Sequence, residues 1–201
     1  LPKAEFDCAL ERLARAKSSL SQADGLPGAT EADAEEVRQM LERSLTLLYG
    51  PMPELGERPF FVGCGPIRAS LVSSHVRQTP AFPDYMAQAL GGSALVTSDD
   101  PEEGEIARAV QAAAESSCIV LGTCNAHLKP GQLALMEALG ALGKPMAVAA
   151  LRNPYDLLNL PQGAAGIAVW EYTIRSLEAL APLLAKKRQF TGVMPLVHSV
   201  F

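Results

Sequence analysis

The feature that most limits the fold of this chain is an alternation, from residue 60 onward, between short β-favouring runs and longer segments with helical periodicity. Each of the β-favouring runs is apolar and is followed by polar or turn residues. These runs cover residues 60–64, 94–97, 118–122, 146–151 and 166–169. Such an alternation is typical of βαβ units and predicts a mostly parallel sheet.

The segments between the runs carry apolar residues at three- and four-residue spacing, which predicts helices. The predicted helices cover residues 84–90, 101–115, 130–142 and 174–187. Pro101 and Pro130 suit the first turn of a helix, where a missing N–H costs no hydrogen bond. The expected fold is therefore α/β, a three-layer α/β/α sandwich with a mostly parallel sheet of five or six strands.

The chain begins with a segment of helical periodicity only. Residues 1–20 predict an amphipathic helix with one apolar face. That face is formed by Phe6, Leu10, Leu13 and Leu20. A linker with Gly and Pro follows, and Thr30 with the acidic residues after it predicts a second helix that runs to about Tyr49. We expect a helical arm and linker over 1–29 and an α/β domain over 30–201.

Composition and charge exclude several classes of function. The net charge is -5 and the basic residues are scattered, so we expect no binding of nucleic acid or of anionic membranes. No apolar stretch approaches the roughly 20 residues of a membrane-spanning helix. With three histidines and no spaced Cys/His cluster, we expect no metal and no cofactor. The acidic run from Asp99 to Glu103 precedes a predicted helix, where a capping role is favoured over a cation site.

In an open parallel sheet, ligands collect beyond the carboxyl ends of the strands, so the loops after each strand are the candidate site. The first such loop, Gly63-Cys64-Gly65-Pro66, begins like a dinucleotide fingerprint. Arg68, however, occupies the place of the third glycine. A tight turn that needs glycine at a positive φ is therefore favoured over a nucleotide site.

The cysteines form no C-x-x-C pair, and Cys64, Cys118 and Cys124 lie in or beside apolar runs, which predicts reduced, buried thiols. Cys124 also lies at a turn between small residues, with His127 three positions further on. Two interpretations follow: a structural cysteine, or the nucleophile of a free-standing Cys–His thiol hydrolase or amidotransferase. The second needs an activated thiolate and a base that a third group orients. The structural interpretation is favoured.

The loop after the next strand reads Arg152-Asn153-Pro154-Tyr155-Asp156. Pro154 forces Asn153 into an extended conformation, and Asp156 can cap the turn or pair with Arg152. Arg, Tyr and Asp offer planar donors, a stacking ring and an acceptor. The loop is therefore either a sugar-facing or domain-facing contact, or a turn held by its own ion pair.

The strands before these two loops should be adjacent and parallel, which would bring the loops to one edge of the sheet. Candidate substrate-binding or cleft-facing residues are Asn125, His127, Arg152, Tyr155 and Asp156. We expect no catalytic residue among them.

Three segments carry a resemblance to a known family. They are residues 122–127 (Gly-Thr-Cys-Asn-Ala-His) followed by Gln132, then Gly143-Lys144-Pro145, then residues 150–157 (Ala-Leu-Arg-Asn-Pro-Tyr-Asp-Leu). In this order they resemble the C-terminal α/β domain of family-three glycoside hydrolases, in the β-N-acetylglucosaminidase branch. Looser similarity covers nearly the whole chain, and residues 1–20 resemble the last helix of the (β/α)8 barrel that precedes this domain.

The resemblance implies a non-catalytic domain that packs on the catalytic barrel and borders its sugar cleft, in carbohydrate or peptidoglycan turnover. These enzymes hydrolyse terminal β-linked N-acetylglucosamine with retention. Their nucleophile and His–Asp acid/base pair lie on the barrel, and neither segment occurs in this sequence. The implied partners are that barrel and a carbohydrate ligand. Cys124 stands where relatives usually have an aromatic residue, so a stacking ring is missing at that position.

The resemblance has a further consequence for the apolar face of residues 1–20, which would normally pack on barrel elements. Exposed apolar surface of this size favours either folding back or pairing with another copy. We expect a homodimer through the N-terminal arm.

Overall fold

The computed structural model describes residues 3–20, 28, 30–66 and 79–194. Arg68, which bears on the nucleotide interpretation, lies outside the described residues, as does most of the predicted linker. The chain divides into two compact units, Leu1–Glu35 and Glu36–Phe201. The expected division between residues 29 and 30 stays a prediction.

The first unit contains the predicted amphipathic helix, α1 (Lys3–Leu20). Its apolar side chains Phe6, Leu10 and Leu13 are 55%, 49% and 52% exposed. After it, Thr30 marks the start of α2 (Glu31–Ser44), because its hydroxyl accepts from the backbone N–H of Asp33 at 3.2 Å. The N–H of Thr30 donates in return to the Asp33 carboxylate at 2.6 Å, so the predicted capped start is confirmed.

The second unit is built on a six-stranded sheet with the order β1-β6-β5-β4-β2-β3. The strands are β1 (Thr46–Tyr49), β2 (Pro59–Cys64), β3 (Ser93–Thr97), β4 (Cys118–Thr123), β5 (Met146–Ala150) and β6 (Ala165–Ala168). Only the pairing of β1 with β6 is antiparallel; the other pairings of the described strands are parallel. The predicted mostly parallel sheet is confirmed.

The first strand, β1, is a correction to the sequence-based prediction. A helix to about Tyr49 was expected, but α2 ends at Ser44 and the chain then pairs with β6. The run Thr46–Tyr49 contains a β-branched and an aromatic residue and begins with a buried side chain, so it fits a half-buried strand. Gly50, at φ 63, ends the strand. Pairing with a distant segment, which the local pattern does not reveal, decides the outcome.

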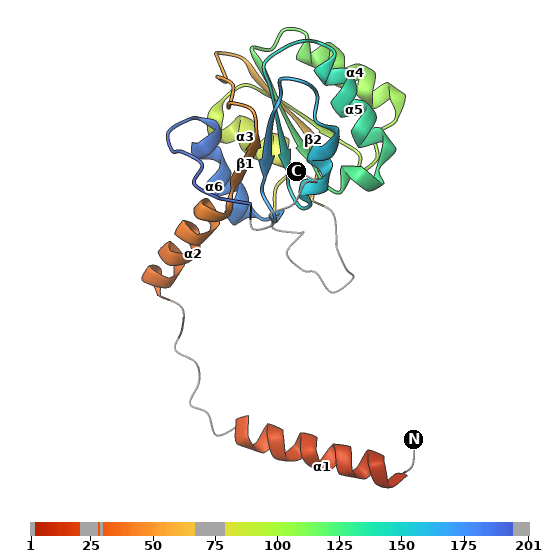
Figure 1. The fold of residues 1–201 in the computed structure, drawn as a ribbon, viewed down its shortest axis with the longest axis vertical. Coiled ribbons are helices and arrows are strands. Elements are labelled where there is room, and N and C mark those ends of the chain that lie inside the picture. Colours follow the sequence, from red (N-terminus) through yellow and green to blue (C-terminus); the bar gives the residue numbers. More distant parts are fainter. Residues whose placement is uncertain (1–2, 21–27, 29, 67–78, 195–201) are drawn as a thin grey trace. The chain divides into compact units, whose positions relative to one another are not determined.

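Helices cover both faces of the sheet (Figure 1). They are α3 (Phe82–Leu90), α4 (Glu103–Ala113), α5 (Pro130–Gly140) and α6 (Ile174–Leu184), with short 3-10 helices η2 (Ala126–Leu128) and η3 (Pro154–Asn159). Pro130 occupies the first turn of α5 as predicted. Pro101 does not occupy the first turn of α4, because the N-cap of α4 is Glu102.

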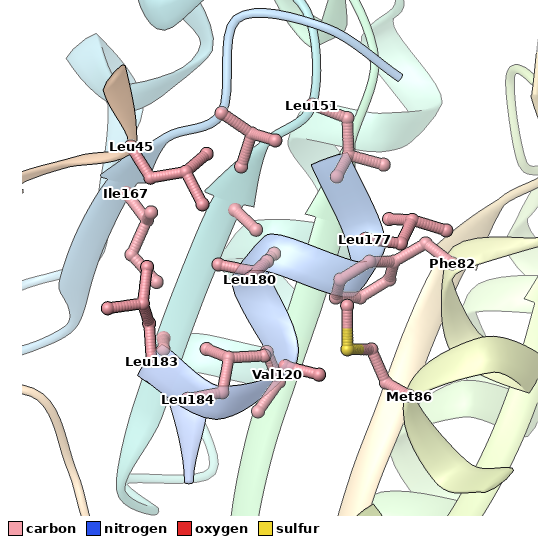
Figure 2. Packing of buried hydrophobic residues seen from close by; sticks show 14 of the residues in the cluster. Leu45, Phe82, Met86, Val120, Leu151, Ile167, Leu177, Leu180, Leu183 and Leu184 are labelled. Atoms are coloured by element: carbon pink, nitrogen blue, oxygen red, sulfur yellow. The ribbon is translucent and has the colours of Figure 1, made fainter. Parts of the chain in front are cut away.

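Alternate residues of each buried strand pack on opposite helix layers, which confirms the three-layer sandwich. Figure 2 shows one face of the sheet, where Leu177, Leu180 and Leu184 of α6 pack on strand residues such as Val120. Phe82 of α3 belongs to the same cluster. The other face packs on α4 and α5. Each large buried side chain contributes roughly 1.5 to 3 kcal/mol. Among the described residues, no helix is long and apolar enough to span a membrane.

Candidate functional site

The site lies where β4 and β5 end. These strands are parallel neighbours with Thr123 opposite Ala150, so their following segments leave the sheet at the same edge. The segment after β4 forms η2 and the segment after β5 leads into η3, and these two short helices contact each other. The predicted meeting of the two loops is confirmed.

His127 and Asp156 form the centre of this edge. The Nδ1 atom of His127 lies 2.9 Å from Oδ1 of Asp156, and the backbone N–H of His127 donates to the same oxygen at 3.2 Å. The Asp156 side chain is fully buried, whereas the His127 side chain is 27% exposed. A carboxylate at Nδ1 favours the neutral tautomer with its proton there, so Nε2 remains a hydrogen-bond acceptor.

The partner of Asp156 corrects one expectation. Within the described residues, Asp156 pairs with His127 and forms no ion pair with Arg152. The turn is held instead by Asn153, whose side chain accepts from the backbone N–H of Tyr155 at 3.1 Å. Asn153 has φ -119 and ψ 119, the extended conformation that the following proline predicts.

Two further candidates flank the His127–Asp156 pair. The ring of Tyr155, whose residue is 45% exposed, meets the His127 ring edge-on at a centroid distance of 6.0 Å. Asn125 is half-buried in a left-handed conformation with φ 57, which Asn tolerates better than most residues. The Tyr155 ring thus contacts His127, and Asn125 lies two residues before His127 in the same loop. Their contact with a ligand stays a prediction.

Cys124 is fully buried, and its thiol hydrogen-bonds to the thiol of Cys64. This bond lowers the pKa of Cys124, and the nearby guanidinium of Arg152 lowers it further, against the effect of burial. The same bond, together with burial, raises the pKa of Cys64. The polar partner of His127 is Asp156 and that of Cys124 is Cys64, so the geometry does not support a Cys–His thiol hydrolase.

Gln132 is a residue of this edge that the sequence analysis did not place. It is buried, and its Oε1 accepts from the backbone N–H of Cys124 at 2.9 Å. Its Nε2 donates to the backbone carbonyls of Asp99 at 2.7 Å and of Cys124 at 3.2 Å. The sequence offered two signals for it: Gln132 belongs to the segments that carry the resemblance, and it is a polar residue in the first turn of a mostly apolar helix.

The acidic run plays two roles. Glu102 caps α4 through a capping box with Glu105, as predicted. Asp99 and Asp100 instead hold the start of α5: Asp99 pairs with Lys129 at 2.5 Å and Asp100 accepts from the N–H of Gly131 at 2.7 Å. The described residues contain no group of three or more His, Cys, Asp or Glu side chains arranged to hold a metal ion.

Close packing of β2 against β4 explains why Gly63, near the end of β2, is a glycine. Gly63 has φ 147, and a Cβ atom there would lie 2.2 Å from the carbonyl oxygen of Gly122 on β4. The predicted glycine at a positive φ is confirmed, but it lies inside β2 rather than in the turn that follows, and residues 67–78 lie outside the described residues. The end of β2 is also held by Tyr172, whose hydroxyl donates to the backbone carbonyl of Cys64 at 2.9 Å.

No family model and no curated protein matches the sequence. Solved structures do match. The glycoside hydrolase family 3 β-N-acetylglucosaminidase from Paenibacillus sp. str. FPU-7 superposes with a TM-score of 0.76 over 97% of this chain, at 25% identity. This chain has the fold of the C-terminal α/β domain of glycoside hydrolase family 3, the family that its sequence resembles.

The chain is also similar to part of a fungal multi-domain glycoside hydrolase family 3 β-N-acetylglucosaminidase, with a TM-score of 0.70 and 22% identity over 99% of the chain. A β-glucosidase from Listeria innocua shares the fold over 79% of the chain, with a TM-score of 0.64 and 14% identity. The chain spans 40%, 24% and 26% of these three proteins. It therefore corresponds to less than half the length of each of them.

Proposed function

We propose that this domain is non-catalytic and packs on a (β/α)8 barrel of the same enzyme. We further propose that its carboxyl edge, the edge of the sheet where β4 and β5 end, borders the sugar cleft of that barrel. One observation carries the proposal: nearly all of this chain matches only 40% of the Paenibacillus enzyme. The remainder of that enzyme has no counterpart here. This partial coverage favours the role of an auxiliary domain over that of a complete glycosidase.

The carboxyl groups of the described edge support the non-catalytic role. Most retaining glycoside hydrolases use a carboxylate nucleophile and an acid/base carboxyl group about 5 Å apart, and the branch that this sequence resembles also needs a free carboxylate nucleophile. Asp156 is fully buried against His127, Asp99 is paired with Lys129, and Asp100 holds the N–H of Gly131. All three have structural partners.

The groups that remain accessible at the edge suit a sugar. Nε2 of His127 can accept from a hydroxyl, the ring of Tyr155 can stack on a pyranose face, and the side chains of Asn125 and Arg152 supply hydrogen-bond donors. The fixed orientation of His127 by Asp156 means that little rotamer freedom is lost on binding. The proposed ligand is a β-linked N-acetylglucosamine-containing saccharide in carbohydrate or peptidoglycan turnover.

A chimera tests this role: the matched 40% of the Paenibacillus enzyme is replaced by this chain. We expect the chimera to cleave an aryl β-N-acetylglucosaminide. Either His127→Ala or Tyr155→Ala should lower kcat/KM by roughly 3- to 10-fold, the equivalent of one lost contact of about 0.5 to 1.5 kcal/mol. Arg108→Ala, an exposed residue of α4, is the matched control. An active chimera in which all three variants match the parent would reject the cleft-facing role.

We also propose that the chain alone forms a homodimer through α1. The exposed Phe6, Leu10 and Leu13 form an apolar stripe at helical spacing, and burial of such side chains drives association. Light scattering over a concentration series should show a dimer that the double variant Phe6→Asp, Leu13→Asp converts to a monomer. A parent that stays monomeric at every concentration would reject the dimer.

A further inference from the structure

Two buried cysteines meet at the carboxyl edge of the sheet, and the proposed function uses neither thiol. Cys64 is the last residue of β2, and Cys124 directly follows β4. The two strands are parallel neighbours with Gly63 opposite Gly122. Neighbouring strands lie about 4.8 Å apart, and a disulfide joins Cα atoms roughly 4.4 to 6.8 Å apart. By this register Cys64 lies opposite Thr123, and Cys124 is one residue further along, so the two cysteines are diagonal neighbours at adjacent strand ends. The hydrogen bond between their thiols shows that the two side chains meet.

The backbone on both sides of this pair is held in place. A Cβ atom on Gly63 would lie 2.2 Å from the carbonyl oxygen of Gly122, so the two strands approach closely just before the cysteines. The backbone N–H and carbonyl of Cys124 are both bonded to the Gln132 side chain, and the carbonyl of Cys64 accepts from the Tyr172 hydroxyl. The thiols themselves are hydrogen-bonded to each other. The backbone at both cysteines is therefore fixed, and their thiols contact each other.

The two thiols are chemically unequal. Cys64 donates its proton toward the sulfur of Cys124, and this bond, with the Arg152 guanidinium, lowers the pKa of Cys124 despite burial and the nearby carboxylates of Asp156 and Asp99. Cys64 keeps its proton. Cys118 offers the contrast, because burial alone raises its pKa to about 11. Cys124 is thus the more acidic thiol of the pair.

We propose that Cys64 and Cys124 are a peroxide-sensitive dithiol that closes to a disulfide between the end of β2 and the residue that follows β4. The Cys124 thiolate attacks one oxygen of hydrogen peroxide, the O–O bond breaks, and hydroxide leaves, which gives a sulfenic acid. The Cys64 sulfur then attacks the Cys124 sulfur. The S–S bond forms as the sulfenic S–O bond breaks, and the sulfenic hydroxyl leaves as water with the Cys64 proton. The hydroxide from the first step takes up the proton that Cys124 had lost and becomes the second water. Two thiols lose two electrons, and one peroxide is reduced to two waters.

Burial determines which oxidants act on this pair. Cys64 is 2% exposed and Cys124 is 0% exposed, so large reagents have no direct access. Hydrogen peroxide is close to water in size and enters through small local openings. Iodoacetamide should label the exposed Cys8 quickly in the native chain, and Cys64 and Cys124 only after denaturation. The disulfide would fix the position of the residue just before Asn125, so oxidation should act on the loop that carries His127.

The test uses the full chain with Cys8→Ser, which removes the exposed thiol. The native protein is treated with hydrogen peroxide, quenched with catalase, denatured in acid, alkylated, and digested without reductant. Mass spectrometry should find the Cys64 and Cys124 peptides joined, with a mass two hydrogens below their sum, and dithiothreitol should separate them. Cys118 should be recovered alkylated. Recovery of Cys64 and Cys124 on separate peptides, whether alkylated or oxidised to sulfinic acid, would overturn the proposal.

Variants give a second, independent readout. Peroxide should raise the melting temperature of the Cys8→Ser chain and of its Cys118→Ala derivative, because the crosslink restricts the unfolded chain. Cys64→Ala and Cys124→Ala, each in the same background, should show no such rise and no joined peptides. An equal rise in all four proteins would contradict a crosslink at this pair. The peptide analysis of the Cys8→Ser chain stands even if one of the two alanine variants fails to fold.

Discussion

The faces of the sheet and the edge at the carboxyl ends of β4 and β5 both contain buried side chains, but the buried side chains differ in chemistry. On the faces, strand residues such as Val120 and Ile167 pack on Leu180 of α6, and all three are fully buried. At the edge, the residues buried to the same degree are Asp156, Gln132 and Cys124. Burying a polar group is unfavourable unless a hydrogen bond compensates for lost hydration. At this edge the compensation comes from the hydrogen bonds of Asp156 to His127 and of Gln132 to Cys124 and Asp99, whereas the faces depend on apolar packing.

A core substitution should have the largest effect on stability and should leave the edge intact. Leu180→Ala removes a fully buried side chain from the α6 layer (Figure 2), and we expect a loss of about 2 to 5 kcal/mol of unfolding free energy. Urea unfolding measures this loss, with Leu158→Ala as control because Leu158 is 47% exposed. The His127 ring signals in NMR spectra should not move. Equal unfolding free energies of the two variants would contradict the role of Leu180 in the packed face of the sheet.

An edge substitution should cost less. Asp156→Ala leaves the N–H and Nδ1 of His127 without their shared acceptor, and we expect a loss of about 1 to 3 kcal/mol. Asp156→Asn retains an acceptor oxygen and should lose less than Asp156→Ala. Urea unfolding compares the three proteins at one pH. If Asp156→Ala unfolds at the same urea concentration as the parent, the pair contributes nothing to the native state.

The faces could be predicted from the sequence because burial between helix layers leaves a local signature. Apolar runs such as residues 118–122 and helical spacing in residues 174–187 mark strands and helices without knowledge of their neighbours. β1 escaped prediction because its identity as a strand depends on pairing with β6, far along the chain. The helical spacing of the residues before it does not indicate that the helix ends at Ser44 and a strand begins at Thr46.

The edge could be predicted only in part. The meeting of the loops that carry His127 and Asp156 followed from two consecutive parallel strands, and that expectation is confirmed. The Arg152–Asp156 pair was wrong, because side-chain direction rather than spacing selects the partner. The contact of Cys64 with Cys124 was not foreseen either. It requires β2 to lie between β3 and β4, an order that the sequence does not display.

We propose that this domain supports a catalytic barrel and performs no hydrolysis itself. The most direct measurement is release of nitrophenol from an aryl β-N-acetylglucosaminide by the purified chain alone. We predict no turnover above buffer, because binding groups without a nucleophile and an acid cannot lower the barrier enough. Turnover that survives repurification, and that is abolished by Cys124→Ala, His127→Ala or Asp156→Ala, would contradict the account.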